Sequence, residues 1–226
     1  MSRKIAVFDC DGTLIDGQAS ICDAMEAAFG AARLPVPDRN AVRRAVGLSL
    51  PQAVRRLLPD HDAALHARVV EAYKLAFRGA RSDGSLSQPL FEGIADVLAA
   101  LADAGWQLGV ATGMSDRGLA HCLASHALTD RFVTTQTADR HPSKPHPAML
   151  EAALFEAGFD AGRGASGRAD EAVMIGDTSY DMLMASSAGV RAIGVAWGYH
   201  APEELVAAGA EFVAGTPAEL KEYLLR

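Results

Sequence analysis

Two aspartates separated by one residue follow the first apolar run of the chain. Asp9 and Asp11 come directly after residues 5–8, a run typical of a buried strand in a parallel sheet. Side chains two positions apart on an extended segment point the same way, so both carboxylates are expected to face one spot beyond that strand. Gly12 permits a sharp turn there, and Thr13 adds a hydroxyl.

Two carboxylates this close repel each other, which makes the pair informative. At ~5 Å and an effective dielectric constant of ~20, the repulsion costs about 3 kcal/mol. A fold keeps such a pair when a cation or a shared proton relieves the repulsion. The pair therefore indicates a site for chemistry, whereas an isolated Asp-Gly is equally typical of an ordinary turn.

Polar side chains also follow later apolar runs. Thr112 ends the run 106–111, Lys144 lies in a proline-rich loop, and Asp177 follows the run 172–175 with Asp181 four residues on. Taken singly, these are typical of a helix cap, a solvated lysine and a turn. In open α/β sheets ligands bind beyond the carboxyl ends of the strands, so together they predict one site.

In order along the chain, these residues read D-x-D-G-T, T, K and G-D-x-x-x-D between positions 9 and 181. This series resembles the four motifs of the haloacid dehalogenase superfamily of phosphohydrolases. The resemblance implies a helical cap between the first and second motifs, as in phosphoglycolate phosphatases, β-phosphoglucomutases and phosphonatases. Two positions depart from the pattern: Gly113 stands where relatives often have Asn, and Ser143 precedes Lys144 where Gly is common.

The resemblance also implies roles for the first-motif residues and for Asp177. Asp9 is the nucleophile that forms an aspartyl-phosphate, and Asp11 protonates the leaving alcohol before it deprotonates the hydrolytic water. The metal ligands for Mg²⁺ are Asp9, Asp177 and the backbone carbonyl of Asp11, which supply the oxygen atoms that this cation prefers.

The remaining motif residues are expected to bind the phosphoryl group. The Thr112 hydroxyl and the loop amides near Gly12 and Gly113 donate to its oxygens, and the Lys144 ammonium neutralises their charge. Asp181 is expected to orient Lys144 or a metal-bound water.

The elements that position these groups alternate between strand and helix. Strands are predicted at 5–8, 106–111, 132–134, 172–175, 192–196 and 212–213 with helices between most of them, and 160–170 is predicted to be a loop. Alternation implies parallel strands and right-handed crossovers, here a Rossmann-like doubly wound α/β core. Residues 1–16 and 87–226 form this core, and 17–86, with helical periodicity only, form a small all-helical cap.

Charge is distributed unevenly between these two parts. The 226-residue chain has a net charge of −7, which argues against general binding to nucleic acid or to an anionic membrane. The insertion has ten basic and seven acidic residues, a net +3, which leaves −10 for the core. This distribution suggests an anionic substrate between the parts, with Arg43 and Arg44, and also 55–56, as candidate contacts. Hinges are expected near 16–17 and 83–84.

The sequence also bears on the compartment and on the cysteines. No apolar run approaches 18 residues and the N-terminal one is too short for a signal peptide, so a cytoplasmic protein is expected. The resemblance implies a small phosphate ester as partner, and either a monomer or a homodimer is expected. Cys10, Cys22 and Cys122 show no CxxC spacing, and Cys10 is interpreted as a packing residue. Residues 197–200 are expected to border the mouth of the site.

The leading hypothesis is a Mg²⁺-dependent phosphatase for a small metabolite, with phosphoglycolate as the family-level candidate. A phosphomutase would keep the same core and differ by excluding water. A 2-haloacid dehalogenase would release chloride without metal, and a phosphonatase would need a cap lysine, for which the insertion offers only Lys74. A non-catalytic phosphometabolite-binding protein is the alternative from a different class.

Overall fold

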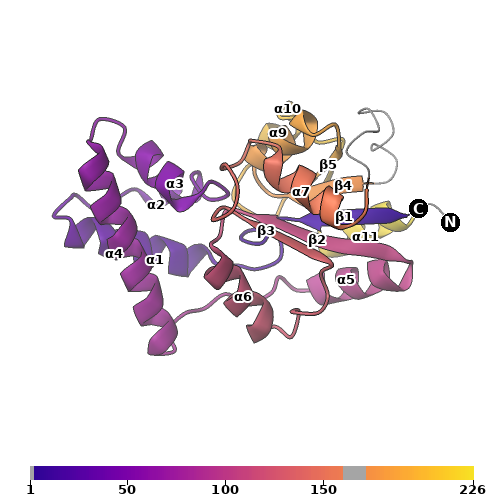
Figure 1. Ribbon diagram of the computed structural model, residues 1–226, viewed down its shortest axis with the longest axis horizontal. Helices are drawn as coiled ribbons and strands as arrows, with labels where there is room; N and C mark the ends of the chain where they lie inside the picture. Colours follow the sequence, from indigo (N-terminus) through magenta and orange to yellow (C-terminus); the bar gives the residue numbers. More distant parts are fainter. Residues whose placement is uncertain (1–2, 160–171) are drawn as a thin grey trace.

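The computed structural model describes residues 3–159 and 172–226, and the loop expected at 160–170 lies outside them. Six parallel strands form a single sheet in these residues (Figure 1). Their bounds are β1 Lys4–Phe8, β2 Trp106–Thr112, β3 Thr134–Thr137, β4 Ala172–Gly176, β5 Arg191–Val195 and β6 Phe212–Ala214.

The strand order is β3-β2-β1-β4-β5-β6. The chain moves outward from β1 through β2 to β3 and then returns to the other side of β1 for β4, β5 and β6. The switch point therefore lies between β1 and β4, and the predicted doubly wound core is confirmed. Ligand sites of such sheets lie at the carboxyl ends of the strands at this point.

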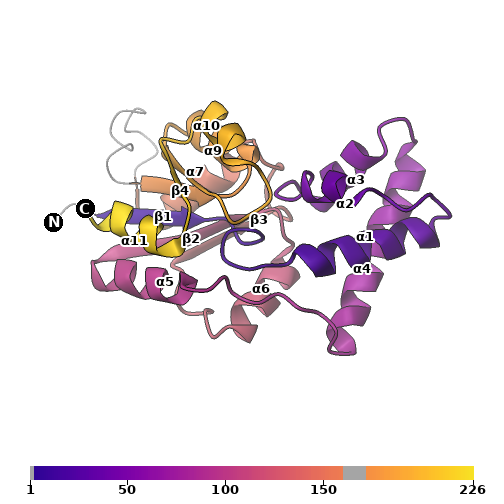
Figure 2. The same ribbon diagram turned by 180° about the vertical axis from the view of Figure 1, so that it is seen from behind.

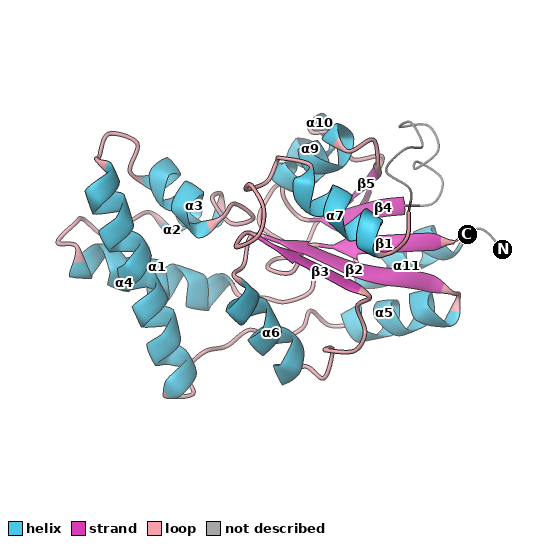
Figure 3. Cartoon of the chain, in the orientation of Figure 1, coloured by secondary structure: helices cyan, strands magenta, loops and turns pink. Residues whose placement is uncertain are grey.

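Helices cover both faces of the sheet (Figure 3). They are α5 Ile94–Asp103, α6 Asp116–Ser125, α7 Ala148–Glu156, α9 Ser179–Ser187, α10 Pro202–Ala207 and α11 Pro217–Leu225. Because side chains alternate along a strand, Ala6 and Phe8 of β1 pack in the core under α5 and α11. Ile5 and Val7 pack on the opposite face in the core under α7 and α9.

Four helices between β1 and α5 form the predicted helical insertion. They are α1 Gln18–Ala31, α2 Arg39–Arg43, α3 Leu50–Leu57 and α4 Ala63–Ser82. Both views show them together beyond the carboxyl ends of the strands (Figures 1 and 2). They share an apolar core of their own in which Phe29, Val54 and Val69 are buried. None of the helices described is long and apolar enough to cross a membrane.

The third strand differs from its predicted position. Apolar residues favoured 132–134, but the structure places β3 at Thr134–Thr137. Phe132 is buried in a core cluster instead, and Val133 is 55% exposed just before the strand. The strand residues are polar but bonded: Thr134 Oγ1 donates to Glu156 (2.6 Å) and Thr137 Oγ1 to Asp116 (2.6 Å).

Core packing between α5 and the sheet generates a stability prediction. Leu101 of α5 is completely buried, so Leu101→Ala leaves a cavity and is expected to lower the free energy of unfolding by about 2–5 kcal/mol. The measurement is chemical denaturation followed by circular dichroism. Leu183→Ala removes the same atoms from a side chain that is 43% exposed, and a loss as large as that of Leu101→Ala would contradict the assignment.

Candidate active site

Asp9 and Asp177 meet at the switch point of the sheet. Phe8 of β1 pairs with Ile175 of β4, so the residues that follow these strands leave the same edge side by side. The Asp9 amide donates to the Ile175 carbonyl (2.8 Å), which holds the first-motif loop against β4. Both aspartates are buried. The parallel register therefore brings together carboxylates that are distant in sequence, as predicted.

Lys144 is buried between two of these carboxylates. Its Nζ lies 2.9 Å from Asp9 Oδ1 and 2.6 Å from Asp181 Oδ1. The other Asp181 oxygen accepts from the Thr178 amide (3.1 Å) and hydroxyl (2.7 Å) at the start of α9. Burial opposes the charge of Lys144, but Asp181 and Asp9 outweigh it and raise the pKa of the ammonium. Lys144 is thus a fixed cation beside Asp9.

The Asp177 carboxylate is held by two donors. Thr13 Oγ1 donates to Oδ1 (2.7 Å) and the Tyr199 amide to Oδ2 (2.9 Å). Gly12 has a φ of +86°, and a Cβ at this position would lie 2.2 Å from Asp177 Oδ2. The first-motif loop can therefore approach Asp177 this closely only with glycine at position 12.

Burial strongly perturbs these acidic groups. It raises the pKa of Asp9 to about 6, although Lys144 lowers it. Burial and the neighbouring Asp9 charge raise the pKa of Asp11 to about 7. The pKa of Asp177 is also raised well above its usual range, by burial and by Asp181. The folded chain therefore holds protons on these carboxyls at pH values where exposed aspartates are ionised.

Two of the buried carboxylate oxygens, Asp9 Oδ2 and Asp11 Oδ1, have no hydrogen-bond partner within the described residues. Asp9, Asp177 and Asp181 each offer an oxygen, and the three oxygens lie within 4.8 Å of one another. A buried unpaired carboxylate oxygen is costly unless a cation or proton satisfies it. The donor set, made only of oxygen, fits a hard divalent cation such as Mg²⁺.

Thr112 ends β2, and Gly113 follows it next to the cap. Thr112 is buried, and its Oγ1 accepts from the Met114 amide (3.3 Å). A Cβ at position 113 would lie 2.6 Å from the Leu48 carbonyl oxygen and 2.7 Å from that of Gly47. The cap loop thus occupies the space that a side chain at 113 would need.

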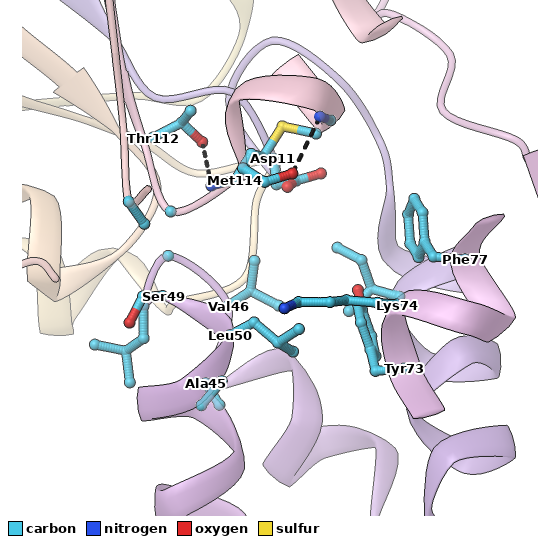
Figure 4. A pocket seen from close by; sticks show the side chains of 18 of the residues that line it. Asp11, Ala45, Val46, Ser49, Leu50, Tyr73, Lys74, Phe77, Thr112 and Met114 are labelled. Carbon is cyan, nitrogen blue, oxygen red and sulfur yellow. Dashed lines mark hydrogen bonds between the residues drawn. The ribbon is translucent and has the colours of Figure 1, made fainter. Parts of the chain in front are cut away.

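A cavity of about 380 Å³ lies between the cap and the core. The motif residues that line it are Asp9, Asp11, Thr112 and Gly113. Figure 4 shows Asp11, Thr112 and Met114 on one side of this space and cap side chains on the other. Lys144, Asp177 and Asp181 do not line the cavity.

Basic residues also line this cavity, but they differ from the predicted candidates. The lining includes Lys74, Arg78, Arg81 and Arg117. Arg43, Arg44, Arg55 and Arg56 are not part of it. Instead, Arg43 donates to Asn40 (2.8 Å), and Arg44 forms an ion pair with Glu204 of α10 that joins the cap to the core. The net charge of the insertion correctly indicated a basic cap, but it could not indicate which arginines face the cavity.

Cys10, between the two first-motif aspartates, points away from the site. It is completely buried in a core cluster, with its Sγ 3.8 Å from that of Cys122. The hydrogen bond with Cys122 and burial raise the pKa of this thiol, so it is not a nucleophile. This supports its interpretation as a packing residue.

Comparison with known proteins extends this picture. The model of the haloacid dehalogenase-like hydrolase family matches residues 6–195. "Probable phosphatase IndB" of Dickeya dadantii is 35% identical over 96% of this chain and 92% of its own length. A phosphoglycolate phosphatase of Vibrio vulnificus is 27% identical over 98% and 96%. The fold matches a hydrolase structure from Pseudomonas syringae with a TM-score of 0.83 at 24% identity, covering 99% and 98% of the two chains.

These matches agree with the motifs and with the cluster of buried carboxylates at the switch point. The expected resemblance to phosphoglycolate phosphatases is confirmed by the relatives that match over nearly the whole chain. On the family match and on the similarity of these relatives, the chain belongs to the haloacid dehalogenase-like hydrolases.

Proposed function

We propose that this hydrolase is a Mg²⁺-dependent phosphatase that cleaves small phosphate monoesters through an aspartyl-phosphate on Asp9. The observation that carries the proposal is the state of the Asp9 carboxylate. One oxygen is held by Lys144 and by the Cys10 amide (2.7 Å), while the other has no partner in the described chain. Asp9 also lines the cavity, where a substrate can reach it.

The residues that would hold Mg²⁺ are Asp9, Asp177 and the backbone carbonyl of Asp11. Asp181 offers a third carboxylate, but its two oxygens are already bonded to Lys144 and Thr178, which favours a role in orienting the lysine. When bound, the cation supplies positive charge to the phosphoryl oxygens.

In the first step, an Asp9 oxygen attacks phosphorus and the bond from phosphorus to the ester oxygen breaks. Asp11 gives its proton to the departing alkoxide, so an alcohol is released. Because its pKa is about 7, a substantial fraction of the Asp11 carboxyl is protonated at neutral pH. In the second step Asp11 takes a proton from water, which attacks phosphorus and releases inorganic phosphate and free Asp9.

The surrounding groups bind the phosphoryl oxygens. The ammonium of Lys144 balances their charge, and the Thr112 hydroxyl with the loop amides near Gly12 and Gly113 donates to them. Arg81 of the cap and Arg117 of the core line the same cavity and give it the positive charge that attracts a phosphate dianion. Phosphoglycolate, the substrate named for several relatives, is the first to assay. The three free cysteines suit a reducing cytoplasm, where we place a monomer or homodimer.

One observation bears on the alternative activity of a phosphonatase. Lys74 lines the cavity, where a phosphonatase would need a lysine to form a Schiff base. However, Lys74 is exposed and pairs with Glu71 (2.8 Å), whereas Schiff-base lysines are desolvated or lie beside another cation. Borohydride trapping on Lys74 would be needed to favour a phosphonatase over the phosphatase.

Removal of the nucleophile tests the mechanism directly. Asp9→Asn is expected to reduce hydrolysis of p-nitrophenyl phosphate to the rate without enzyme, because the amide cannot accept the phosphoryl group. Phosphate release is measured at saturating Mg²⁺, and circular dichroism checks the fold. Substantial activity in a folded variant would rule out attack by Asp9.

The acid role of Asp11 predicts a dependence on the leaving group. Asp11→Asn is expected to lower kcat/KM, which reports the step in which the alcohol leaves, by about 10²–10⁴-fold for an alkyl phosphate. p-Nitrophenyl phosphate should lose much less, since nitrophenolate leaves without a proton. Asp139→Asn changes another carboxyl of the cavity and serves as the control. Equal losses on both substrates would contradict the role of Asp11.

The metal site predicts a pH-dependent stabilisation. Without metal, the raised pKa values of Asp9 and Asp11 mean that the folded state binds more protons than the unfolded state between about pH 4 and about pH 7. Stability then falls as pH rises through this window. Mg²⁺ replaces the protons on its carboxylate ligands Asp9 and Asp177, so it should raise Tm more above pH 7 than near pH 5. At 100 times Kd the gain is about 2.7 kcal/mol.

Thermal unfolding in EDTA and in Mg²⁺ at the two pH values measures this effect. Asp177→Asn should remove most of the stabilisation by Mg²⁺, because it removes one proposed ligand. A Tm that does not respond to Mg²⁺, or an equal response in Asp177→Asn, would count against the assigned ligands.

A further inference from the structure

We propose that the leaving group of the substrate carries an apolar group of the size of an aromatic ring, which packs against Tyr73 and Phe77 of the cap. The inference rests on the proposed phosphatase function and narrows its substrate class. It goes beyond the two-carbon acid of phosphoglycolate, because the wall of the cavity that faces the nucleophile is mainly apolar.

The cap side of the cavity carries this argument. Opposite Asp11 and Thr112, Figure 4 shows aliphatic and aromatic side chains around the open space, with Phe77 and Tyr73 along α4. The apolar cap residues that reach the lining include Val46, Leu50, Tyr73 and Phe77. A leaving group attached to a phosphoryl group at Asp9 extends from the core toward this wall.

Tyr73 and Phe77 form a preorganised surface. They lie four residues apart on α4, their ring centroids are 5.5 Å apart, and the ring planes differ by 26°. Both are only partly buried by the cap core and also line the cavity. Stacked rings held on one helix face bind a flat apolar group with little loss of side-chain entropy.

The size of the cavity points the same way. A glycolate leaving group, with five non-hydrogen atoms, fills roughly 150 Å³ if each is scaled from ~30 Å³ for a water molecule. The cavity holds about 380 Å³, within the range of sites that enclose larger ligands and are lined mainly by apolar side chains. A ring would displace water from Tyr73 and Phe77, which a two-carbon acid cannot do.

The basic residues of the lining would favour a different substrate, one whose leaving group is acidic. Arg81 and Arg117 have no ion-pair partner in the described ranges, and an acidic leaving group such as glycolate would pair with them. Assays must therefore compare an apolar ring, a small apolar group and a carboxylate, all attached through alkyl oxygens so that their chemical reactivities are similar.

The test measures kcat/KM for 2-phenylethyl phosphate, ethyl phosphate and phosphoglycolate at saturating Mg²⁺. We expect the phenylethyl ester to exceed ethyl phosphate by roughly 100-fold, in line with the discrimination that apolar pockets achieve. It should also exceed phosphoglycolate. Phe77→Ala should lower the ratio of phenylethyl to ethyl phosphate by about 10-fold, and Phe77→Leu, which keeps apolar volume, should lower it less.

Leu75→Ala is the matched control, because Leu75 lies on the same helix but is 67% exposed and outside the lining. It should leave the ratio unchanged. A ratio near one in the wild-type protein, or a preference for phosphoglycolate, overturns the inference while Asp9-dependent phosphate release keeps the proposed function. Should no ester release phosphate in an Asp9-dependent manner, the proposed function fails and the inference with it.

Discussion

The structure depends on the balance between three buried carboxyls, the partly buried carboxyl of Asp11 and one buried ammonium. Lys144 pairs with Asp9 and Asp181, while Asp11 and Asp177 add negative charge at the same site. An isolated buried carboxylate is costly, so such a group can persist only when a cation, a proton or fixed donors compensate its charge. The raised pKa values of Asp9, Asp11 and Asp177 show that proton binding is one way in which this negative charge is compensated. Under the proposed function, a divalent cation among the carboxylates would compensate the same negative charge.

Much of this convergence could be predicted from the sequence because parallel strands end at one edge of the sheet. Asp9 and Asp177 each follow an uninterrupted apolar run, and such runs are typical of central strands. The strand order was not predicted, and the structure shows that β1 and β4 are neighbours. What the sequence could not show is the complete burial of Lys144, since a lysine in a proline-rich loop is normally solvated.

The parts that were missed depend on contacts between distant segments. The residues of β3 are polar, and their burial becomes acceptable only because Glu156 and Asp116 accept from their hydroxyls. Likewise, the periodicity of the cap predicts helices but not which face of α4 meets the core. The packing of α1 on α4 fixes that face, and it turns Tyr73 and Phe77 toward the cavity.

Gly113 shows how a departure from a family pattern gains a physical meaning in the structure. Judged by sequence, glycine here means the loss of a side-chain amide that could contact phosphate. In the structure, the carbonyls of Gly47 and Leu48 occupy the space of any side chain at 113. The Ser49 amide also donates to Ser143 Oγ (2.8 Å), beside Lys144, so the cap loop contacts two motif segments at once. Glycine at position 113 therefore permits the cap loop to approach the end of β2 this closely.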